Sequence, residues 1–329
     1  MVMMNRIKTL VILVNLGSPD ELSLSAIRKF LKLFLRDQRV VRLPKWLWYP
    51  ILYAIILPFR AKKLIKQYQQ IWKLNQSPLV LYTNFLKHKV QKLLNLEQHL
   101  VKVDAAFCYS SPSLDTVLAT ITKDALIENL IIVPLYPQFS STTTLPVFDQ
   151  LADFYRKQNN LPNLNLIRGF ATDPLYIDAI TNSIKTHWQI TPPGKKLIFS
   201  FHSLPKDIIN KGDPYYQECL QSAHLIAANL GLDQSKYEIT FQSKFGYQKW
   251  LEPSTQNRVK SLALENVESI DIVCPGFICD CLETLEEIAI LNKQVFLDNG
   301  GKHYNYIACL NDSQDLAKLI VSLIQPNLK

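Results

Sequence analysis

The sequence predicts an α/β protein of two similar domains, each a parallel sheet flanked by helices. Short apolar runs recur along the chain, and most of them are followed by a segment of helical periodicity. Repeated strand and helix is typical of parallel sheets that are covered on both faces. At 329 residues the chain exceeds the usual length of one domain, which favours two.

The expected strands and helices alternate along the whole chain. Seven apolar runs are expected to be strands, at residues 10–16, 103–109, 130–136, 197–202, 237–243, 270–276 and 304–310. Helical periodicity is clearest in LSLSAIRKFLKLFL, SLDTVLATITKDAL, YYQECLQSAHLIAANL and CLETLEEIAILNKQVF. After the expected loop NNLPNLN, we place a boundary near Thr172-Asp173-Pro174, between domains of residues 1–172 and 173–329. The sequence leaves open whether the last helical segment, SQDLAKLIVSLIQ, packs back on the first domain.

The composition excludes several classes of protein. With nine glycines, the chain has neither the G-x-G-x-x-G pattern of dinucleotide-binding folds nor a P-loop, so we expect no nucleotide. The site is expected where the carboxyl ends of the strands face a crevice. The six cysteines are scattered through a chain without a secretion signal, which indicates reduced thiols in the cytosol, and the C-x4-C-x-C spacing of Cys274, Cys279 and Cys281 matches no common zinc pattern. The apolar run after MVMMNRIKT is too short for a secretory signal and is expected to be the first strand.

The charge and one apolar segment indicate possible partners. Basic residues outnumber acidic ones by 36 to 28, and the net charge of +8 suits an anionic partner. The basic residues are spread out and no recognised motif is present, so we expect no nucleic acid partner. Residues 42–66 contain an apolar stretch, Trp46 to Phe59, that is too short to span a bilayer and has basic residues at both ends. It fits an element on a membrane surface, the rim of a pocket for a large flat ligand, or a buried core helix.

Two side chains at the ends of predicted elements have the chemistry for catalysis. His202 ends a strand, where a neutral imidazole can exchange a proton near neutral pH; the alternative is a core histidine bonded to a backbone carbonyl. Glu283 opens a helix on which Glu286 and Glu287 share its face. The alternative there is that the carboxylates only complement the helix dipole.

Five motifs of the chain resemble those of the ferrochelatase family. They are VNLGSPD (14–20), LYPQFSSTT (135–143), FSFHSLPKDIINKGDPYYQEC (199–219), FQSKFGYQKWLEPST (241–255) and CPGFICDCLETLEEI (274–288). The resemblance covers nearly the whole chain. It implies two Rossmann-like domains with the active cleft between them, and insertion of ferrous iron into protoporphyrin IX to give protohaem, the last step of haem biosynthesis. Iron and porphyrin are then substrates, and no permanently bound cofactor is expected.

The resemblance also implies roles for individual residues. His202 and Glu283 are the implied catalytic pair and metal ligands, with His202 assigned to proton abstraction, and Asp280 and Glu287 continue an acidic path. Porphyrin contacts are implied at Leu16, Trp46, Tyr109, Ser140, Trp250 and Phe277, with Trp48 as a further candidate wall. Such a lyase is expected in the cytoplasm as a monomer or homodimer, attached peripherally to a membrane through residues 42–66.

The chain departs from the family pattern at several positions. Cys108 stands where relatives commonly have arginine, which keeps a non-catalytic tetrapyrrole carrier as an alternative. Leu16 stands where relatives acting on coproporphyrin often have tyrosine, which favours protoporphyrin over the alternative of a coproporphyrin chelatase. Asn75-Gln76-Ser77-Pro78 replaces the usual Gly-Gly-Ser-Pro. No cysteine follows Cys309, so we expect no iron–sulfur cluster of the kind that some relatives carry on a C-terminal extension.

Overall fold

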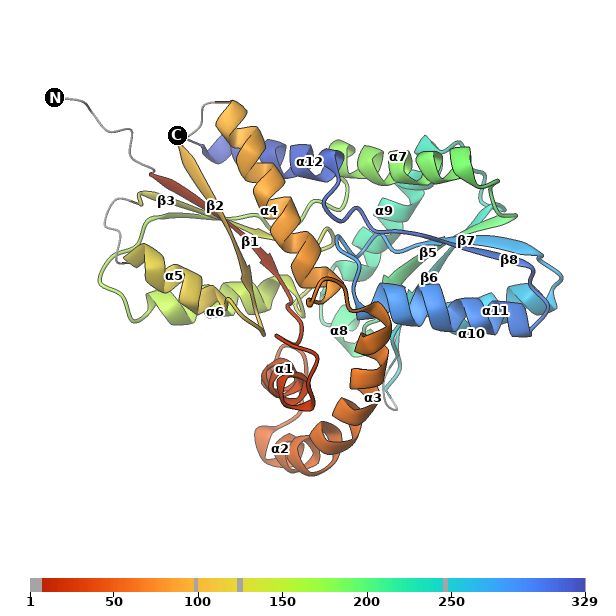
Figure 1. The fold of residues 1–329 in the computed structure, drawn as a ribbon, viewed down its shortest axis with the longest axis horizontal. Helices are drawn as coiled ribbons and strands as arrows, with labels where there is room; N and C mark the ends of the chain where they lie inside the picture. Colours follow the sequence, from red (N-terminus) through yellow and green to blue (C-terminus); the bar gives the residue numbers. More distant parts are fainter. Residues whose placement is uncertain (1–7, 98–99, 123–126, 245–247, 329) are drawn as a thin grey trace. The chain divides into compact units, whose positions relative to one another are not determined.

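The structure, a computed structural model, describes residues 8–97, 100–122, 127–244 and 248–328, and two four-stranded parallel sheets organise them (Figure 1). Contacts between residues divide the chain into two compact units. Unit 1 comprises residues 1–135, 141–169 and 312–329, and unit 2 comprises residues 136–140 and 170–311. The predicted fold class, two parallel sheets flanked by helices, is confirmed.

The sheet of unit 1 has the strand order β2-β1-β3-β4. Its strands are β1 (Thr9–Asn15), β2 (Val101–Phe107), β3 (Asn129–Pro134) and β4 (Asn163–Leu166). Every residue of β1 and β3 is buried, because helices cover both faces of the sheet. The register pairs Asn15 with Phe107 and Val14 with Pro134, so the carboxyl ends of β1, β2 and β3 lie at one edge of the sheet.

The helices of unit 1 include three that begin with a serine cap. They are α1 (Leu24–Arg36), α2 (Lys45–Ile51), η1 (Leu52–Ile56), α3 (Leu57–Ile71), α4 (Pro78–Leu96), α5 (Leu114–Thr122), α6 (Thr144–Tyr155), α12 (Gln314–Ile324) and η3 (Gln325–Asn327). The side chains of Ser23, Ser77 and Ser313 accept backbone N–H groups in the first turns of α1, α4 and α12. The last long helix, α12, packs along α4, and Lys89 of α4 forms an ion pair of 2.6 Å with Asp312.

Unit 2 repeats the arrangement with the strand order β6-β5-β7-β8. Its elements are α7 (Pro174–Ile190), β5 (Lys196–His202), α8 (Lys206–Asn210), α9 (Tyr215–Asn229), β6 (Tyr237–Gln242), α10 (Thr255–Leu264), β7 (Ser269–Val273), η2 (Glu283–Asn292), α11 (Lys293–Asp298) and β8 (His303–Ile307). The central strand β5 is buried along its length apart from its two end residues, which are half-buried. Its carboxyl end therefore presents a partly accessible side chain, His202, on a rigid support.

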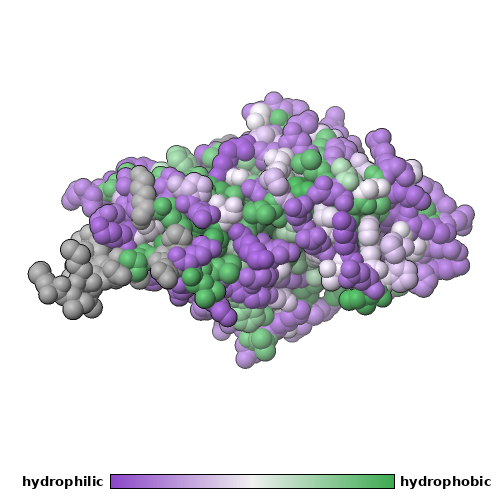
Figure 2. Space-filling view, turned by 90° about the horizontal axis from the view of Figure 1, so that it is seen from above, coloured by the Kyte–Doolittle hydropathy of each residue, from purple (hydrophilic) through white to green (hydrophobic). Residues whose placement is uncertain are grey.

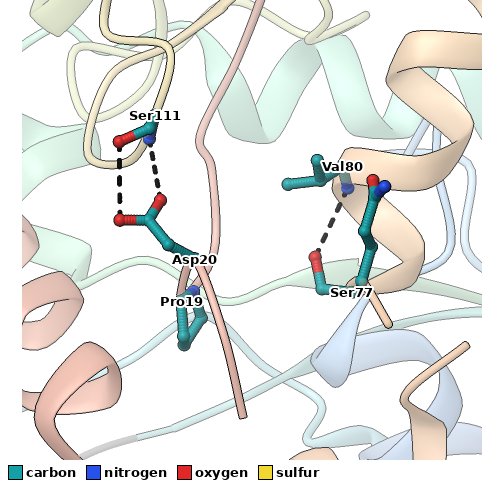
Figure 3. A pocket seen from close by; sticks show the side chains of 6 residues that line it. Pro19, Asp20, Ser77, Val80 and Ser111 are labelled. Carbon is teal, nitrogen blue, oxygen red and sulfur yellow. Dashed lines mark hydrogen bonds between the residues drawn. The ribbon is translucent and has the colours of Figure 1, made fainter. Parts of the chain in front are cut away.

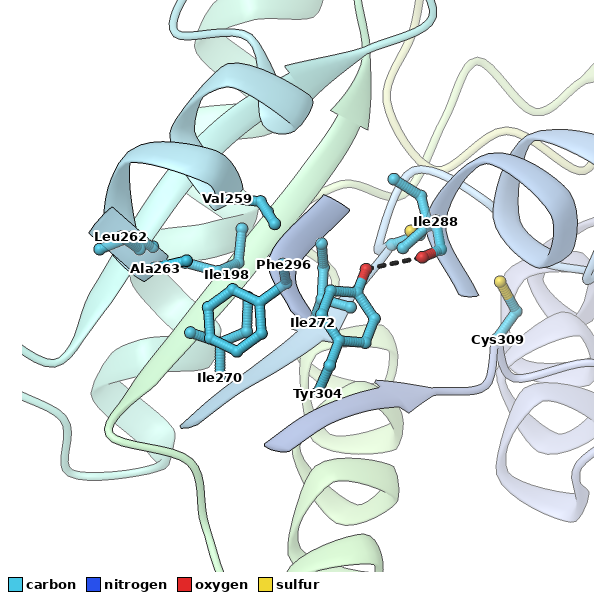
Figure 4. Packing of buried hydrophobic residues seen from close by; sticks show 11 residues of the cluster. Ile198, Val259, Leu262, Ala263, Ile270, Ile272, Ile288, Phe296, Tyr304 and Cys309 are labelled. Carbon is cyan, nitrogen blue, oxygen red and sulfur yellow. Dashed lines mark hydrogen bonds between the residues drawn. The ribbon is translucent and has the colours of Figure 1, made fainter. Parts of the chain in front are cut away.

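The core of unit 2 also fixes one of its helices (Figure 4). Ile198 of β5, Ile272 of β7 and Phe296 of α11 are fully buried in one apolar cluster. Tyr304 of β8 joins this cluster, and its hydroxyl donates to the carbonyl oxygen of Ile288 in η2 at 2.6 Å. The helix η2 is thus bonded to the sheet as well as packed on it.

Two local features differ from the sequence prediction. β4 begins inside the segment NNLPNLN, which was expected to be a loop, and ends one residue beyond it. It is an edge strand with half-buried and exposed residues, so it has no apolar run by which to recognise it. The segment Glu283–Asn292 is a π-helix where an α-helix was expected, and the apolar spacing of the sequence did not reveal this change.

The surface of the molecule is mixed in character. Hydrophilic side chains cover most of the face in Figure 2, with hydrophobic residues in smaller groups between them. Across the ranges that the structure describes, no helix combines the length and the apolar character needed to cross a membrane.

Candidate functional site

His202 is held by a hydrogen bond that fixes its tautomer. It is half-buried at the end of β5, and its Nδ1 lies 2.7 Å from the carbonyl oxygen of Ser203. A carbonyl oxygen only accepts, so Nδ1 carries the proton of the neutral ring. The lone pair is therefore on Nε2, where it can accept a proton.

The neighbouring strand connects His202 to the helix η2. The register of β5 and β6 pairs His202 with Gln242, a buried residue. The Nε2 of Gln242 donates to the carbonyl oxygen of Glu283 at 2.8 Å, and its Oε1 accepts from the hydroxyl of Ser200 at 2.8 Å. Gln242 therefore joins the ends of two strands to the first residue of η2.

The π-helix η2 presents two acidic side chains beside its inner row. Thr284, Ile288 and Asn292, spaced by four, are buried and form the inner row. Glu283 and Glu287 precede Thr284 and Ile288 by one position and are half-buried. π-Helical turns are rare and occur frequently at functional sites, because the extra residue redirects the side chains.

The Glu287 carboxylate lies among other polar and charged groups. The backbone N–H of Ser243 donates to its Oε1 at 2.7 Å, and the Ser243 hydroxyl donates to its Oε2. Burial raises the pKa of Glu287, while the two donors of Ser243 and the charge of His202 act in the opposite direction; the negative charge of Glu283 adds to the rise. The structure thus brings Glu287 within electrostatic reach of both His202 and Glu283.

Asp280 is enclosed in a hydrogen-bond network. It is 3% exposed, and its oxygens accept from the hydroxyl of Tyr306 at 2.5 Å, the Nδ2 of Asn311 at 2.8 Å and the hydroxyl of Thr284 at 3.1 Å. These bonds connect the loop before η2 to β8 and the segment after it. Asp280 is therefore part of the support of η2, and its membership of an acidic path stays a prediction.

Two aromatic residues lie close to the His202 segment. The ring of Phe277, half-buried in the loop after β7, has its centroid 6.4 Å from that of His202. Trp250 is half-buried, and its backbone pairs with that of Pro205 in an isolated antiparallel bridge. Pro205 follows His202 by three residues. Of the predicted porphyrin contacts, Phe277 thus lies beside the candidate base, and Trp250 is bridged to the segment that follows it.

None of the six cysteines, all of which lie in the described part of the chain, forms a disulfide bond, and most are buried. All six are free thiols, and burial raises the pKa of Cys274, Cys281 and Cys309. In the part of the chain that the structure describes, no three His, Cys, Asp or Glu side chains are grouped so as to hold a metal ion.

In unit 1, Leu16 and Tyr109 lie together at the ends of β1 and β2. The Tyr109 N–H donates to the Leu16 carbonyl at 3.1 Å, and the buried Tyr109 hydroxyl donates to Asp37 at 2.7 Å. Cys108 is half-buried, and burial together with the charge of Asp37 raises the pKa of its thiol to about 12. Cys108 is therefore neutral at physiological pH and provides no cation in place of the arginine common in the family.

The remaining predicted porphyrin contacts differ widely in exposure. Trp46 on α2 is 78% exposed, whereas Ser140 is 1% exposed and donates to Asp213 at 3.0 Å. Trp48, the further candidate wall, is 8% exposed, and its indole N–H donates to the Leu35 carbonyl at 2.6 Å. The structure therefore makes Trp48 an anchor of α2 on α1, because its ring is covered by the protein itself.

Unit 1 also contains a hollow of about 270 Å³ near the carboxyl ends of β1 and β2 (Figure 3). Asp20 reaches across to Ser111, whose N–H donates to it at 3.0 Å, and Ser77 caps α4 on the opposite wall. Although partial burial acts in the opposite direction, hydrogen bonds from Lys29 and Ser111 lower the pKa of Asp20. Gln76, in the loop where the chain departs from the family pattern, also lines the hollow.

Ser243 is the site residue that sequence reasoning missed. It follows β6 directly and has a positive φ of 65°, a conformation that non-glycine residues rarely adopt. Its place after a buried strand, inside the motif FQSK, was the available signal. Nothing in the sequence indicated that it would contact a carboxylate more than forty residues further along the chain.

Solved structures with a similar backbone show which fold the chain adopts. SirB from Bacillus subtilis, solved with Fe3+, matches with a TM-score of 0.58 at 10% identity, covering 98% of this chain and 96% of that one. CbiX, the terminal enzyme of sirohaem biosynthesis in denitrifying bacteria, matches with a TM-score of 0.52 at 12% identity, covering 98% and 100%. The fold is therefore the chelatase fold that these two proteins share.

Sequence similarity then gives the family. The family model described as ferrochelatase matches residues 8–328. The ferrochelatases of Janthinobacterium sp. (strain Marseille) and of Vibrio cholerae are each 41% identical to this chain and match 98% of it. The match covers 87% of the Janthinobacterium protein and 99% of the Vibrio protein. The chain belongs to the ferrochelatase family, which confirms the resemblance of the five motifs, and its homologues are enzymes that insert metal into porphyrin.

Proposed function

We propose that this protein inserts ferrous iron into protoporphyrin IX and releases protohaem, the last step of haem biosynthesis. The observations that carry the proposal are the His202 ring, whose Nδ1 is bonded to the Ser203 carbonyl, and the Glu287 carboxylate within electrostatic reach of that ring, in a chain of the ferrochelatase family. Iron and porphyrin are both substrates of this reaction, and we propose that it requires no permanently bound cofactor.

The reaction exchanges two protons for one divalent cation. The porphyrin loses two pyrrole N–H protons and gains Fe2+, so the charge balances and no redox step is needed. We assign the first proton to Nε2 of His202, because its Nδ1 proton is engaged by the Ser203 carbonyl. Glu283 and Glu287 offer carboxylate oxygens, which hold divalent iron weakly enough to release it to the ring nitrogens.

Ring contacts complete the proposal. A planar porphyrin directs its nitrogen lone pairs inward, so bending of the ring would expose them to the base and the metal, at a cost offset by apolar contacts. We propose Phe277 and Trp250 as contacts in unit 2, supported by the ring of Phe277 next to His202. The other proposed contacts are Leu16, Trp46, Tyr109 and Ser140.

Anaerobic mixing of the purified protein with ferrous iron and protoporphyrin IX tests the function. The absorption spectrum of haem should appear at a rate proportional to enzyme concentration. Porphyrin binding with metal insertion no faster than in detergent alone would reject catalysis and favour a carrier. Faster turnover of coproporphyrin than of protoporphyrin would instead assign the other substrate.

We also propose that the protein works in the cytoplasm on a membrane surface, to which it attaches through residues 42–66. Three successive helices of this segment carry exposed apolar side chains: Trp46 is 78%, Ile55 53% and Phe59 69% exposed. Arg42 and Lys45 precede these side chains, a combination that suits the interface of an anionic bilayer. The six free thiols are consistent with a reducing compartment.

Sedimentation with liposomes tests the attachment. Trp46→Ser combined with Phe59→Ser should lower the fraction that sediments with phosphatidylglycerol-containing vesicles. Ile190→Ser is the matched control, because Ile190 is 83% exposed on a helix of the other unit and should not affect sedimentation. Equal sedimentation of all three proteins would argue against this surface.

A further inference from the structure

Ser243 makes two separate contacts with one carboxylate at the end of β6. Its backbone N–H donates to one oxygen of Glu287 and its hydroxyl donates to the other. The residue has a φ of 65°, which costs a non-glycine residue free energy and persists only where the surroundings enforce it. The backbone at Ser243 is thus held in a strained conformation that directs both donors at Glu287.

The surroundings of Ser243 explain how this conformation is maintained. The preceding residue, Gln242, is bonded to the ends of β5 and η2 through its side chain. On the side of η2, Asn292 donates to the carbonyl oxygen of Glu287 at 2.7 Å, and the hydroxyl of Tyr304 donates to the carbonyl oxygen of Ile288. Both the donor and the acceptor segments are therefore fixed to the sheet.

Two donors on two oxygens limit how Glu287 can bind a cation. An ionised carboxylate offers about four lone-pair positions, and bidentate binding of a metal ion uses one on each oxygen. Ser243 occupies one position on each oxygen, which leaves one on each for a metal ion, and its two donors withdraw electron density from both oxygens. Glu287 is therefore a weaker ligand with Ser243 in place than it would be alone.

We propose that Ser243 is a positioning residue that keeps Glu287 a weak ligand for the divalent metal substrate, so that the ion passes on to the porphyrin. The inference rests on the proposed function and deepens it, because it names the group that sets the affinity for iron before insertion. A tighter carboxylate would stabilise the bound ion in the ground state without stabilising the transition state.

Ser243→Ala tests this inference, because it removes the hydroxyl donor and keeps the backbone N–H. In the anaerobic assay, KM for Fe2+ and kcat should both fall about tenfold, the effect of losing one hydrogen bond to a charged group, and kcat/KM for iron should stay nearly constant. Ser243→Gly should give the same kinetic change and a more stable protein than Ser243→Ala, because glycine adopts positive φ without strain.

Two controls separate this role from a structural one. Asn266→Gly relieves a comparable positive φ of 62° in an exposed turn and should leave both constants unchanged. Ser243→Ala introduced into Glu287→Gln should change KM for iron no further, because the carboxylate is already absent. Titration of the porphyrin-free protein with Co2+ should show tighter binding for Ser243→Ala than for the wild type.

The failures of the two proposals are distinguishable. Absence of iron insertion by the wild-type protein rejects the proposed function, whatever Ser243 does. If the wild type turns over and Ser243→Ala has an unchanged or higher KM for iron, or binds Co2+ no more tightly, the role assigned to Ser243 is wrong.

Discussion

Replacement of His202 by alanine separates the chemistry of the site from its stability. A positioned general base contributes about 10²–10⁴-fold to a rate, which corresponds to about 3–5 kcal/mol of activation free energy. The structural loss is smaller: one hydrogen bond to the Ser203 carbonyl and one ring contact with Phe277, about 1 kcal/mol each. His202→Ala should therefore reduce kcat by at least about 100-fold and lower the free energy of unfolding by only about 2 kcal/mol.

His224→Ala is the matched control for this change. Its Nδ1 lies 2.8 Å from the Tyr237 hydroxyl and its ring is 6.0 Å from the Tyr237 ring, so the lost contacts are similar in kind. Both variants should unfold cooperatively in urea, and the tryptophan fluorescence of both should be quenched when porphyrin binds. Only His202→Ala should lose iron insertion. A His202→Ala protein that turns over within fivefold of His224→Ala, on the order of 1 kcal/mol, would refute the assignment of His202 as the base.

Three further outcomes follow from the same geometry. Glu283→Gln should lower the anaerobic insertion rate by about tenfold or more, since it removes the charge of a proposed metal ligand, whereas Glu286→Gln on the same helix should stay near the wild-type rate. Equal rates of the two variants would remove Glu283 from the mechanism. Trp48→Ala should lower the free energy of unfolding in urea by about 3–5 kcal/mol, because the ring is buried. Trp46→Ala should change it by less than about 0.5 kcal/mol. A larger loss for Trp46→Ala than for Trp48→Ala would contradict the burial of Trp48. The pKa of Glu287 is raised in the folded state, so ionisation of this group costs stability as pH rises through that value. Glu287→Gln should therefore have a higher free energy of unfolding than the wild type at pH 8, by a margin that shrinks as the pH falls below the folded pKa. A margin that grew on acidification would mean that folding lowers the pKa of Glu287 and would contradict the prediction.

The sequence revealed those parts of the structure that depend on local apolar patterns. Strands such as β1 and β3, buried on both faces, are continuous apolar runs and were recognisable as strands. The edge strand β4 was missed because half of its residues face solvent. The sequence does not distinguish Trp46 from Trp48. The packing of α2 on α1 leaves Trp46 exposed and buries Trp48.

The chemistry of the site was less predictable than its position. His202 and Glu283 stand at the ends of recognisable elements, but the π-helix η2 and its bonds to distant residues such as Tyr304 and Gln242 left no signal in the sequence. Ser243 acts through a strained φ and a contact with Glu287, neither of which leaves a periodic signal. Residues that join sheet ends to η2 are therefore visible only in three dimensions.

A crystal structure of the protein with protoporphyrin IX bound tests the central claim most directly. The account predicts that Nε2 of His202 faces the pyrrole nitrogens within hydrogen-bond reach, about 3 Å or one water molecule away, with Glu283 and Glu287 near the same ring. A porphyrin bound elsewhere, with the His202 imidazole facing only protein, would contradict it.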